Sequence, residues 1–102
     1  MPETFWKRIE HIMKQAAILI VDDNPEIREI IQILLTGEGF QVHEAANGTQ
    51  ALSQLKENIF DLIILDIMMP GLNGYQTCVE MRKLTNAPIL FLSARTQESD
   101  KT

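Results

Sequence analysis

Short apolar runs alternate along this chain with segments whose apolar residues recur every three or four positions. The apolar runs lie at residues 16–21, in the middle of 61–66 and at 88–92, and Phe40 to Ala45 is expected to form a further strand. The first two of these runs contain no polar residue, which is typical of strands that are buried on both faces. Strands that alternate with helices predict βαβ units, and therefore a parallel sheet that is covered by helices on both sides.

Capping residues mark where the intervening helices begin and end. Asn24-Pro25 supplies an N-cap residue followed by proline at the first helical position. A helix is therefore expected from there to the glycines at 37 and 39, with an apolar face formed by Ile27, Ile30, Ile31, Leu34 and Leu35. A second helix is expected after Asn47-Gly48, and a third over residues 74–84. The third has Tyr75, Cys78, Val79 and Arg82 on one face, with Met81 beside it.

The first fifteen residues form a pattern of their own. Phe5, Ile9, Ile12 and Ala16 recur at helical spacing, with Trp6 and Met13 beside them. We therefore expect an extra amphipathic helix before the first strand. The expected organisation is an N-terminal helical extension at residues 1–15 and one α/β domain at residues 16–102.

Composition excludes several classes of protein. Hydrophobic residues make up 45% of the 102, which is enough for a core. The net charge of −5 and the absence of a basic stripe argue against direct nucleic-acid binding. The single cysteine, Cys78, permits no internal disulfide, and no apolar run approaches the ~18–20 residues that a membrane span needs. The N-terminus does not resemble a secretory signal, so a cytoplasmic setting is expected.

Three carboxylates follow strands of the predicted sheet. Asp22 and Asp23 follow the first strand, and Asp66 ends the third. Ligands of open parallel sheets bind at the carboxyl ends of the strands, so the three acids converge if these strands are neighbours. Their mutual repulsion then calls for a cation, and oxygen ligands of this kind suit Mg²⁺, with the backbone carbonyl of Met68 as a further ligand. Alternatively, each Asp is only a turn or capping residue, although Asn24 already supplies the cap.

One hydroxyl is expected at the same corner. Ser93 ends the fourth strand, where its side chain can donate to a phosphoryl oxygen, or can simply form a turn. Pro70-Gly71 and Gly74 shape the loop that leaves Asp66, as in many ordinary loops.

Residues 18–24, 61–74 and 88–94 together resemble the receiver domain of bacterial two-component response regulators. The resemblance extends over about residues 16–102. It implies a flavodoxin-like, doubly wound parallel sheet and a part in phosphorelay signalling. Such a domain is not an enzyme acting on other molecules, since it assists only its own phosphorylation. It implies a sensor histidine kinase or a phosphotransfer protein as partner and phosphohistidine donor; His11 and His43 of this chain are expected to be structural or surface residues.

The resemblance also implies a role for each candidate site residue. Asp66 resembles the residue that accepts the phosphoryl group, forming an aspartyl phosphate. Asp22 and Asp23 resemble the acidic pair at the Mg²⁺ site, with Asp23 as the direct ligand and Asp22 acting partly through water. The Met68 carbonyl resembles the backbone ligand. Ser93 resembles the hydroxyl that closes on the phosphoryl group, beside a position where Ala94 is suitably small.

The resemblance is incomplete at its C-terminal end. Receiver domains usually have a fifth strand, which ends in a lysine and carries an aromatic residue, and a fifth helix; none of these is found in the 102 residues, and Lys101 is no substitute. We therefore expect an incomplete, four-stranded, truncated receiver whose phosphoryl acceptance is impaired. An uncovered fourth strand would be an exposed edge.

Two other functions are compatible with these features. The first is a non-phosphorylated interaction module that forms a homodimer through the exposed sheet edge or the N-terminal helix. That helix would cover the sheet in its own or a neighbouring chain, or would be only loosely attached. The second is a small Mg²⁺-dependent phosphatase or nucleotide-binding enzyme, which is disfavoured because the chain has neither a Gly-x-Gly-x-x-Gly nor a Gly-Lys-Ser/Thr phosphate loop.

Overall fold

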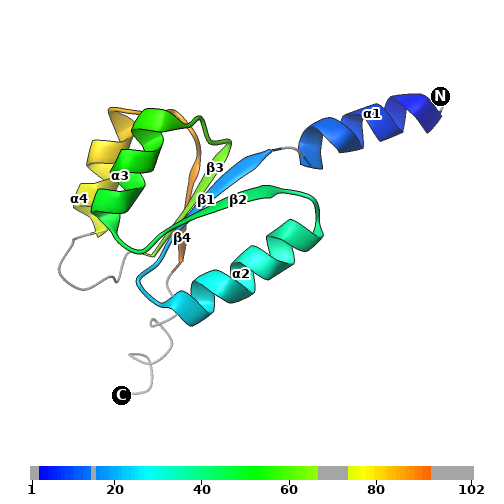
Figure 1. Ribbon diagram of the computed structural model, residues 1–102. Helices are drawn as coiled ribbons and strands as arrows, with labels where there is room; N and C mark the ends of the chain where they lie inside the picture. The colour runs from blue at the N-terminus through cyan, green and yellow to red at the C-terminus, as the bar shows by residue number, and fades with distance from the viewer. Residues whose placement is uncertain (1–2, 15, 67–73, 93–102) are drawn as a thin grey trace, which may run out of the picture.

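The computed structural model describes residues 3–14, 16–66 and 74–92. In this part of the chain helices and strands alternate as the sequence predicts (Figure 1). In chain order the elements are α1 (Glu3–Lys14), β1 (Ala17–Val21), α2 (Pro25–Gly37), β2 (Gln41–Ala45), α3 (Gly48–Glu57), β3 (Leu62–Asp66), α4 (Gly74–Arg82) and β4 (Ile89–Leu92).

The four strands form one parallel sheet in the order β2-β1-β3-β4. The two strands with wholly apolar centres, β1 and β3, lie side by side in the middle, and each is buried along nearly its whole length. Val21 of β1 pairs with Ala45 of β2 on one side and with Leu65 of β3 on the other. This register aligns the carboxyl ends of the two central strands.

Helices cover both faces of the sheet: α3 and α4 lie on one side, and α2 lies on the other (Figure 1). Because side chains alternate between the faces of a strand, each central strand contributes to two cores. One core joins Leu19, Val21, Ile63 and Leu65 to Ala51, Leu55 and Met81 of α3 and α4. The other joins Ile18, Ile20 and Ile64 to Ile31 and Leu35 of α2. The doubly wound parallel sheet predicted from the sequence is confirmed.

The third predicted helix is shorter than predicted, and the structure shows which of its sides is buried. It ends at Arg82, and a turn at 83–84 replaces the predicted last residues. Thr77 and Met81 are buried, whereas Tyr75 and Val79 are 65% and 57% exposed. The side of α4 that contacts the core carries Met81, with Cys78 partly buried beside it.

The strand β4 lies at the edge of the described sheet, as expected. Leu90 and Phe91 are 54% and 41% exposed, although both are apolar. Residues 67–73 and 93–102 lie outside the described part of the chain. The predicted loop after Asp66 is therefore not described.

The expected N-terminal helix is present as α1, which extends away from the sheet (Figure 1). Phe5 and Trp6 are 46% and 59% exposed. Their rings meet edge to face, with the centroids 6.0 Å apart. In this structure α1 therefore does not cover the sheet of its own chain. Among the described residues, no helix is both long enough and apolar enough to cross a membrane.

Candidate metal centre

The register of the sheet brings three carboxylates together where β1 and β3 end. Val21 pairs with Leu65 in parallel strands, so Asp22, which follows Val21, and Asp66, which follows Leu65, lie at the same edge of the sheet. Carboxylate oxygens of Asp22, Asp23 and Asp66 all lie within 4.8 Å of one another. The convergence predicted from the sequence is therefore observed.

The acids differ in burial. Asp22 and Asp66 are only 3% and 7% exposed, and Asp23 is the most exposed of the three. The Oδ1 atom of Asp23 is nevertheless buried and has no hydrogen-bond partner in the described part of the chain. A buried carboxylate oxygen without a donor is costly, so this atom is suited to contact a cation or a further hydrogen-bond donor.

The turn between β1 and α2 is fixed by its own polar groups. The backbone N–H of Asn24 donates to Oδ1 of Asp22 over 2.9 Å. The Asn24 side chain accepts from the backbone N–H groups of Glu26 and Ile27 at 2.9 and 3.3 Å, and therefore caps α2 as predicted. The backbone N–H of Asp22 donates to the carbonyl of Ala45 over 3.1 Å, which ties the turn to the end of β2.

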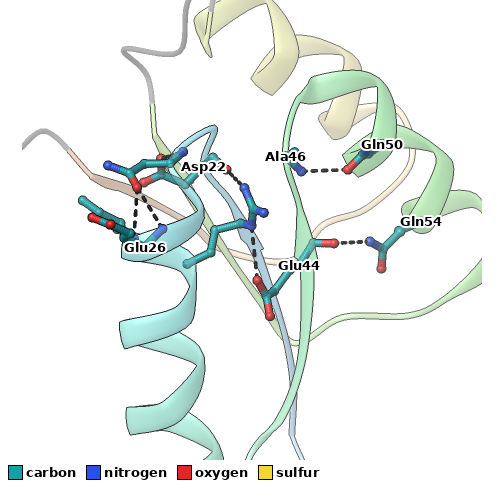
Figure 2. A network of polar contacts seen from close by, with 9 residues as sticks. Asp22, Glu26, Glu44, Ala46, Gln50 and Gln54 are labelled. Atoms are coloured by element: carbon teal, nitrogen blue, oxygen red, sulfur yellow. Dashed lines mark hydrogen bonds and ion pairs between the residues drawn. The ribbon is translucent and has the colours of Figure 1, made fainter.

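One basic residue that the sequence analysis did not single out holds the same turn. Arg28 donates from Nη1 to the carbonyl oxygen of Asp22 over 2.7 Å. Its Nε donates to Oε1 of Glu44 on β2 over 3.2 Å. Figure 2 shows the contacts that link Asp22, Glu44 and Gln54. The sequence offers only a weak indication of this role, namely that Arg28 is a basic residue in the first turns of the helix that follows Asp22 and Asp23.

Burial raises the pKa of Asp22 above its ordinary value. The charges of Asp66 and Asp23 act in the same direction, and the N–H of Asn24 opposes them by favouring the carboxylate. A buried acid among other acids is stabilised in its charged form by a cation. The donor set, which consists only of oxygens and includes the unpartnered Oδ1 of Asp23, fits Mg²⁺.

Comparison with known proteins identifies the family. The family described as "Response regulator receiver domain" matches residues 18–102. This chain belongs to that family. Receiver domains are regulatory modules of two-component signalling, so the resemblance inferred from the sequence is confirmed, together with the fold that it implied.

Relatives of this receiver domain include transcriptional regulators. The transcriptional regulatory protein YrkP of Bacillus subtilis is 48% identical over 85 residues, which cover 83% of this chain and 36% of YrkP. The DNA-binding response regulator MtrA of Mycolicibacterium smegmatis is 42% identical over 83 residues, covering 81% of this chain and 36% of MtrA. The chain thus spans just over a third of the length of these curated relatives.

Solved structures of receiver domains have the same fold. The chemotaxis protein CheY4 of Vibrio cholerae matches with a TM-score of 0.70 and 32% identity, over 85% of this chain and 78% of CheY4. A structure of the histidine kinase ThkA in complex with the response regulator TrrA matches with a TM-score of 0.73 and 41% identity. That match covers 80% of this chain and 72% of the other.

Other candidate residues of the receiver domain are placed as follows. Met68, Ser93, Ala94 and Lys101 lie outside the described residues. His43 lies in β2 and packs edge to face on Phe60, with the ring centroids 5.2 Å apart, which is a structural contact. The structure therefore assembles the acidic half of the predicted site, and the roles of its residues remain predictions.

Proposed function

We propose that this receiver domain takes part in a two-component phosphorelay by accepting a phosphoryl group on Asp66 in a Mg²⁺-dependent reaction. The observation that supports this proposal is the cluster of Asp22, Asp23 and Asp66, whose carboxylate oxygens lie within 4.8 Å of one another. The buried Oδ1 of Asp23, which accepts no hydrogen bond from the part of the chain that the structure describes, favours an arrangement that is completed by a cation.

The donor in this proposal is a phosphohistidine of a sensor histidine kinase or of a phosphotransfer protein. A carboxylate oxygen of Asp66 attacks the phosphorus, and the bond between phosphorus and the histidine nitrogen breaks. The nitrogen leaves with the electron pair and takes up a proton, so that an aspartyl phosphate and a neutral histidine remain. The 41% identical chain in the ThkA–TrrA structure, a response regulator in complex with a histidine kinase, supports a partner of this class.

The residues of the site divide the remaining work. Asp23 would hold Mg²⁺ directly, Asp22 partly through water, and the Met68 carbonyl would supply a further ligand. When bound, the cation offsets the negative charge of the carboxylates and of the phosphoryl oxygens. Ser93 would donate its hydroxyl to a phosphoryl oxygen, beside the small side chain of Ala94.

The 102 residues taken by themselves are expected to react slowly. They contain no lysine at the end of a fifth strand, and losing one such preorganised charge typically costs about 10²–10³ in rate. The domain acts in a cytoplasmic setting, as a regulatory module rather than as an enzyme on other substrates. It does not itself contact nucleic acid, since its net charge is −5.

The test is intact-mass spectrometry after incubation with Mg²⁺ and a small acyl phosphate. We expect an adduct of one phosphoryl group, which disappears in Asp66→Asn and when Mg²⁺ is chelated. Asp61→Asn is the matched control, because Asp61 lies at the other end of the same strand, where Oδ2 accepts from the N–H of Ala17 over 2.8 Å. An unmodified wild-type protein, or an adduct that persists in Asp66→Asn, would contradict the proposal.

A homodimeric interaction module is the alternative function, and the exposed apolar face of α1 favours it. Phe5 and Trp6 are about half exposed, and α1 extends beyond the sheet (Figure 1). A second copy is the proposed partner of this helix or of the β4 edge. Sizing of the wild type and of Phe5→Ser/Ile9→Ser tests this function, with Val79→Ser as a control at another exposed apolar position. A dimer that dissociates only in the α1 variant supports it, and a monomeric wild type refutes it.

A further inference from the structure

We infer that Arg28 is a positioning residue of the Mg²⁺ site, and that it acts through the backbone between Asp22 and Asp23. This inference rests on the proposed function and deepens it, because it assigns a role to a residue outside the acidic cluster. Arg28 is placed to orient the site rather than to bind the cation or the phosphoryl group.

The guanidinium of Arg28 joins two elements that flank the acidic turn. Its Nη1 donates to the Asp22 carbonyl over 2.7 Å, and its Nε donates to Oε1 of Glu44 over 3.2 Å. The Arg28 side chain is 17% exposed and that of Glu44 is 38% exposed, so water competes only in part for these bonds. Because a guanidinium is planar and rigid, two bonds made from different nitrogens fix its position and its orientation.

The anchor on β2 is itself held from α3. The carbonyl of Glu44 accepts from Nε2 of Gln54 over 2.7 Å, and the backbone N–H of Ala46 donates to Oε1 of Gln50 over 2.8 Å. Figure 2 shows these contacts, of Glu44 with Gln54 and of Ala46 with Gln50. Arg28 therefore connects the acidic turn to β2, and β2 is in turn hydrogen-bonded to side chains of α3.

The carbonyl that Arg28 holds belongs to the peptide group that joins Asp22 to Asp23. A peptide group is planar, so fixing its oxygen also fixes the direction in which the chain enters Asp23. The buried Oδ1 of Asp23, which has no hydrogen-bond partner among the described residues, is oriented by this direction of the chain. The ion pair of Arg28 is made with Glu44, so its charge is directed to β2 rather than to the acidic cluster.

The experiment is a calorimetric titration of the 102-residue protein with Mg²⁺ alone, at a temperature at which circular dichroism shows every variant folded. We expect Arg28→Met to weaken Mg²⁺ binding by about tenfold, as for other residues that orient metal ligands. Arg28→Lys should recover part of the loss, because an ammonium group can still donate to the Asp22 carbonyl. Lys83→Met, which breaks the exposed ion pair of Lys83 with Glu80 on α4, is the matched control and should bind Mg²⁺ like the wild type.

The outcomes separate this inference from the proposed function. If the wild type binds no Mg²⁺, the metal site fails and the inference fails with it. If the wild type binds Mg²⁺ and Arg28→Met binds it equally well, only the inference is overturned. A purely structural role would lower the unfolding temperature without Mg²⁺ but leave the affinity of the folded protein unchanged. If Arg28→Met does not fold, Glu44→Ala decides: a weaker affinity supports the inference, and an unchanged affinity overturns it.

Discussion

The backbone N–H of Asn24 donates to Oδ1 of Asp22 over 2.9 Å, within the turn that also carries Asp23. This bond favours the charged form of Asp22, and burial opposes it more strongly. The negative charges of Asp66 and Asp23 add to the effect of burial, so the pKa of Asp22 is raised in the folded protein. Without a cation, ionisation of Asp22 therefore lowers the stability of the folded protein.

The first prediction concerns pH in the absence of divalent cations. Because the pKa of Asp22 is higher in the folded than in the unfolded state, the folded state binds the proton more tightly. The stability from this group is complete below the ordinary pKa of 3.8 and is lost as pH rises through the raised pKa of the folded state. Asp22→Asn cannot ionise and therefore does not lose this contribution. As pH rises through that window, the free energy of unfolding of Asp22→Asn should increase relative to that of the wild type.

Urea unfolding in a chelator, followed by circular dichroism at a series of pH values, measures this difference. Titration of the carboxylates outside the acidic cluster is common to both proteins and largely cancels. Two curves that stay parallel from acid to neutral pH would show that Asp22 has the same pKa in both states.

The second prediction concerns Mg²⁺ and Asp23. A cation that binds only the folded state stabilises it by about 1.4 kcal/mol when its concentration is ten times the dissociation constant. For a domain of this size that is a rise of roughly 6–11 °C in the unfolding temperature. Asp23→Asn should abolish the rise, because it removes a carboxylate of the cluster whose Oδ1 has no hydrogen-bond partner in residues 3–14, 16–66 and 74–92.

Differential scanning calorimetry with and without Mg²⁺ provides the measurement. Glu57→Gln, at an exposed carboxylate where α3 ends, neutralises an acid outside the cluster and should leave the rise intact. Equal unfolding temperatures of the wild type with and without Mg²⁺ would contradict the assignment of a metal site.

Most of the fold was predictable because its signals are local. The apolar centres of β1 and β3 identify the buried middle strands, and Asn24 with Pro25 identifies the start of α2. The spacing places Tyr75, Cys78, Val79 and Arg82 on one face of α4 with Met81 beside it, and it does not decide which side is buried. Tyr75 and Val79 form an apolar stripe by spacing, but Met81 and Thr77 are the buried residues. The packing of Met81 into the core that holds Ile63 and Leu65 of β3 selects the buried side, and this packing is not a local property.

The acidic cluster was predictable for a similar reason. Asp22, Asp23 and Asp66 follow strands, and adjacent parallel strands end at the same edge. Arg28 was missed because its partners, the Asp22 carbonyl and Glu44, come together only through the register of β2 and the placement of α2. The unpartnered Oδ1 of Asp23 likewise depends on side-chain placement, which periodicity does not provide.

The third prediction compares one substitution at two levels of burial. Ile63 in β3 is fully buried between the sheet and α3–α4, whereas Ile33 on α2 is 58% exposed. Ile63→Ala should lower the free energy of unfolding by about 2–5 kcal/mol, through lost burial and the cavity that it leaves. Ile33→Ala, the matched control, should change it by less than about 0.5 kcal/mol, as is usual at surface positions. Urea unfolding midpoints decide, and comparable losses in the two variants would contradict the described packing.

The last prediction concerns the start of α3, whose position fixes Gln50 and Gln54 beside β2. Asn47 caps this helix by accepting from the backbone N–H of Gln50 over 2.8 Å. Asn47→Ala should lower the free energy of unfolding by about 1 kcal/mol, since it leaves that donor without a side-chain partner, and Asn47→Asp should retain most of the stability. Asn58→Ala is the control at the other end of the same helix, where the Asn58 side chain makes only a 3.4 Å contact with the carbonyl of Gln54. Chemical denaturation compares the three variants, and equal losses for Asn47→Ala and Asn58→Ala would show that the Asn47 cap contributes nothing specific to α3.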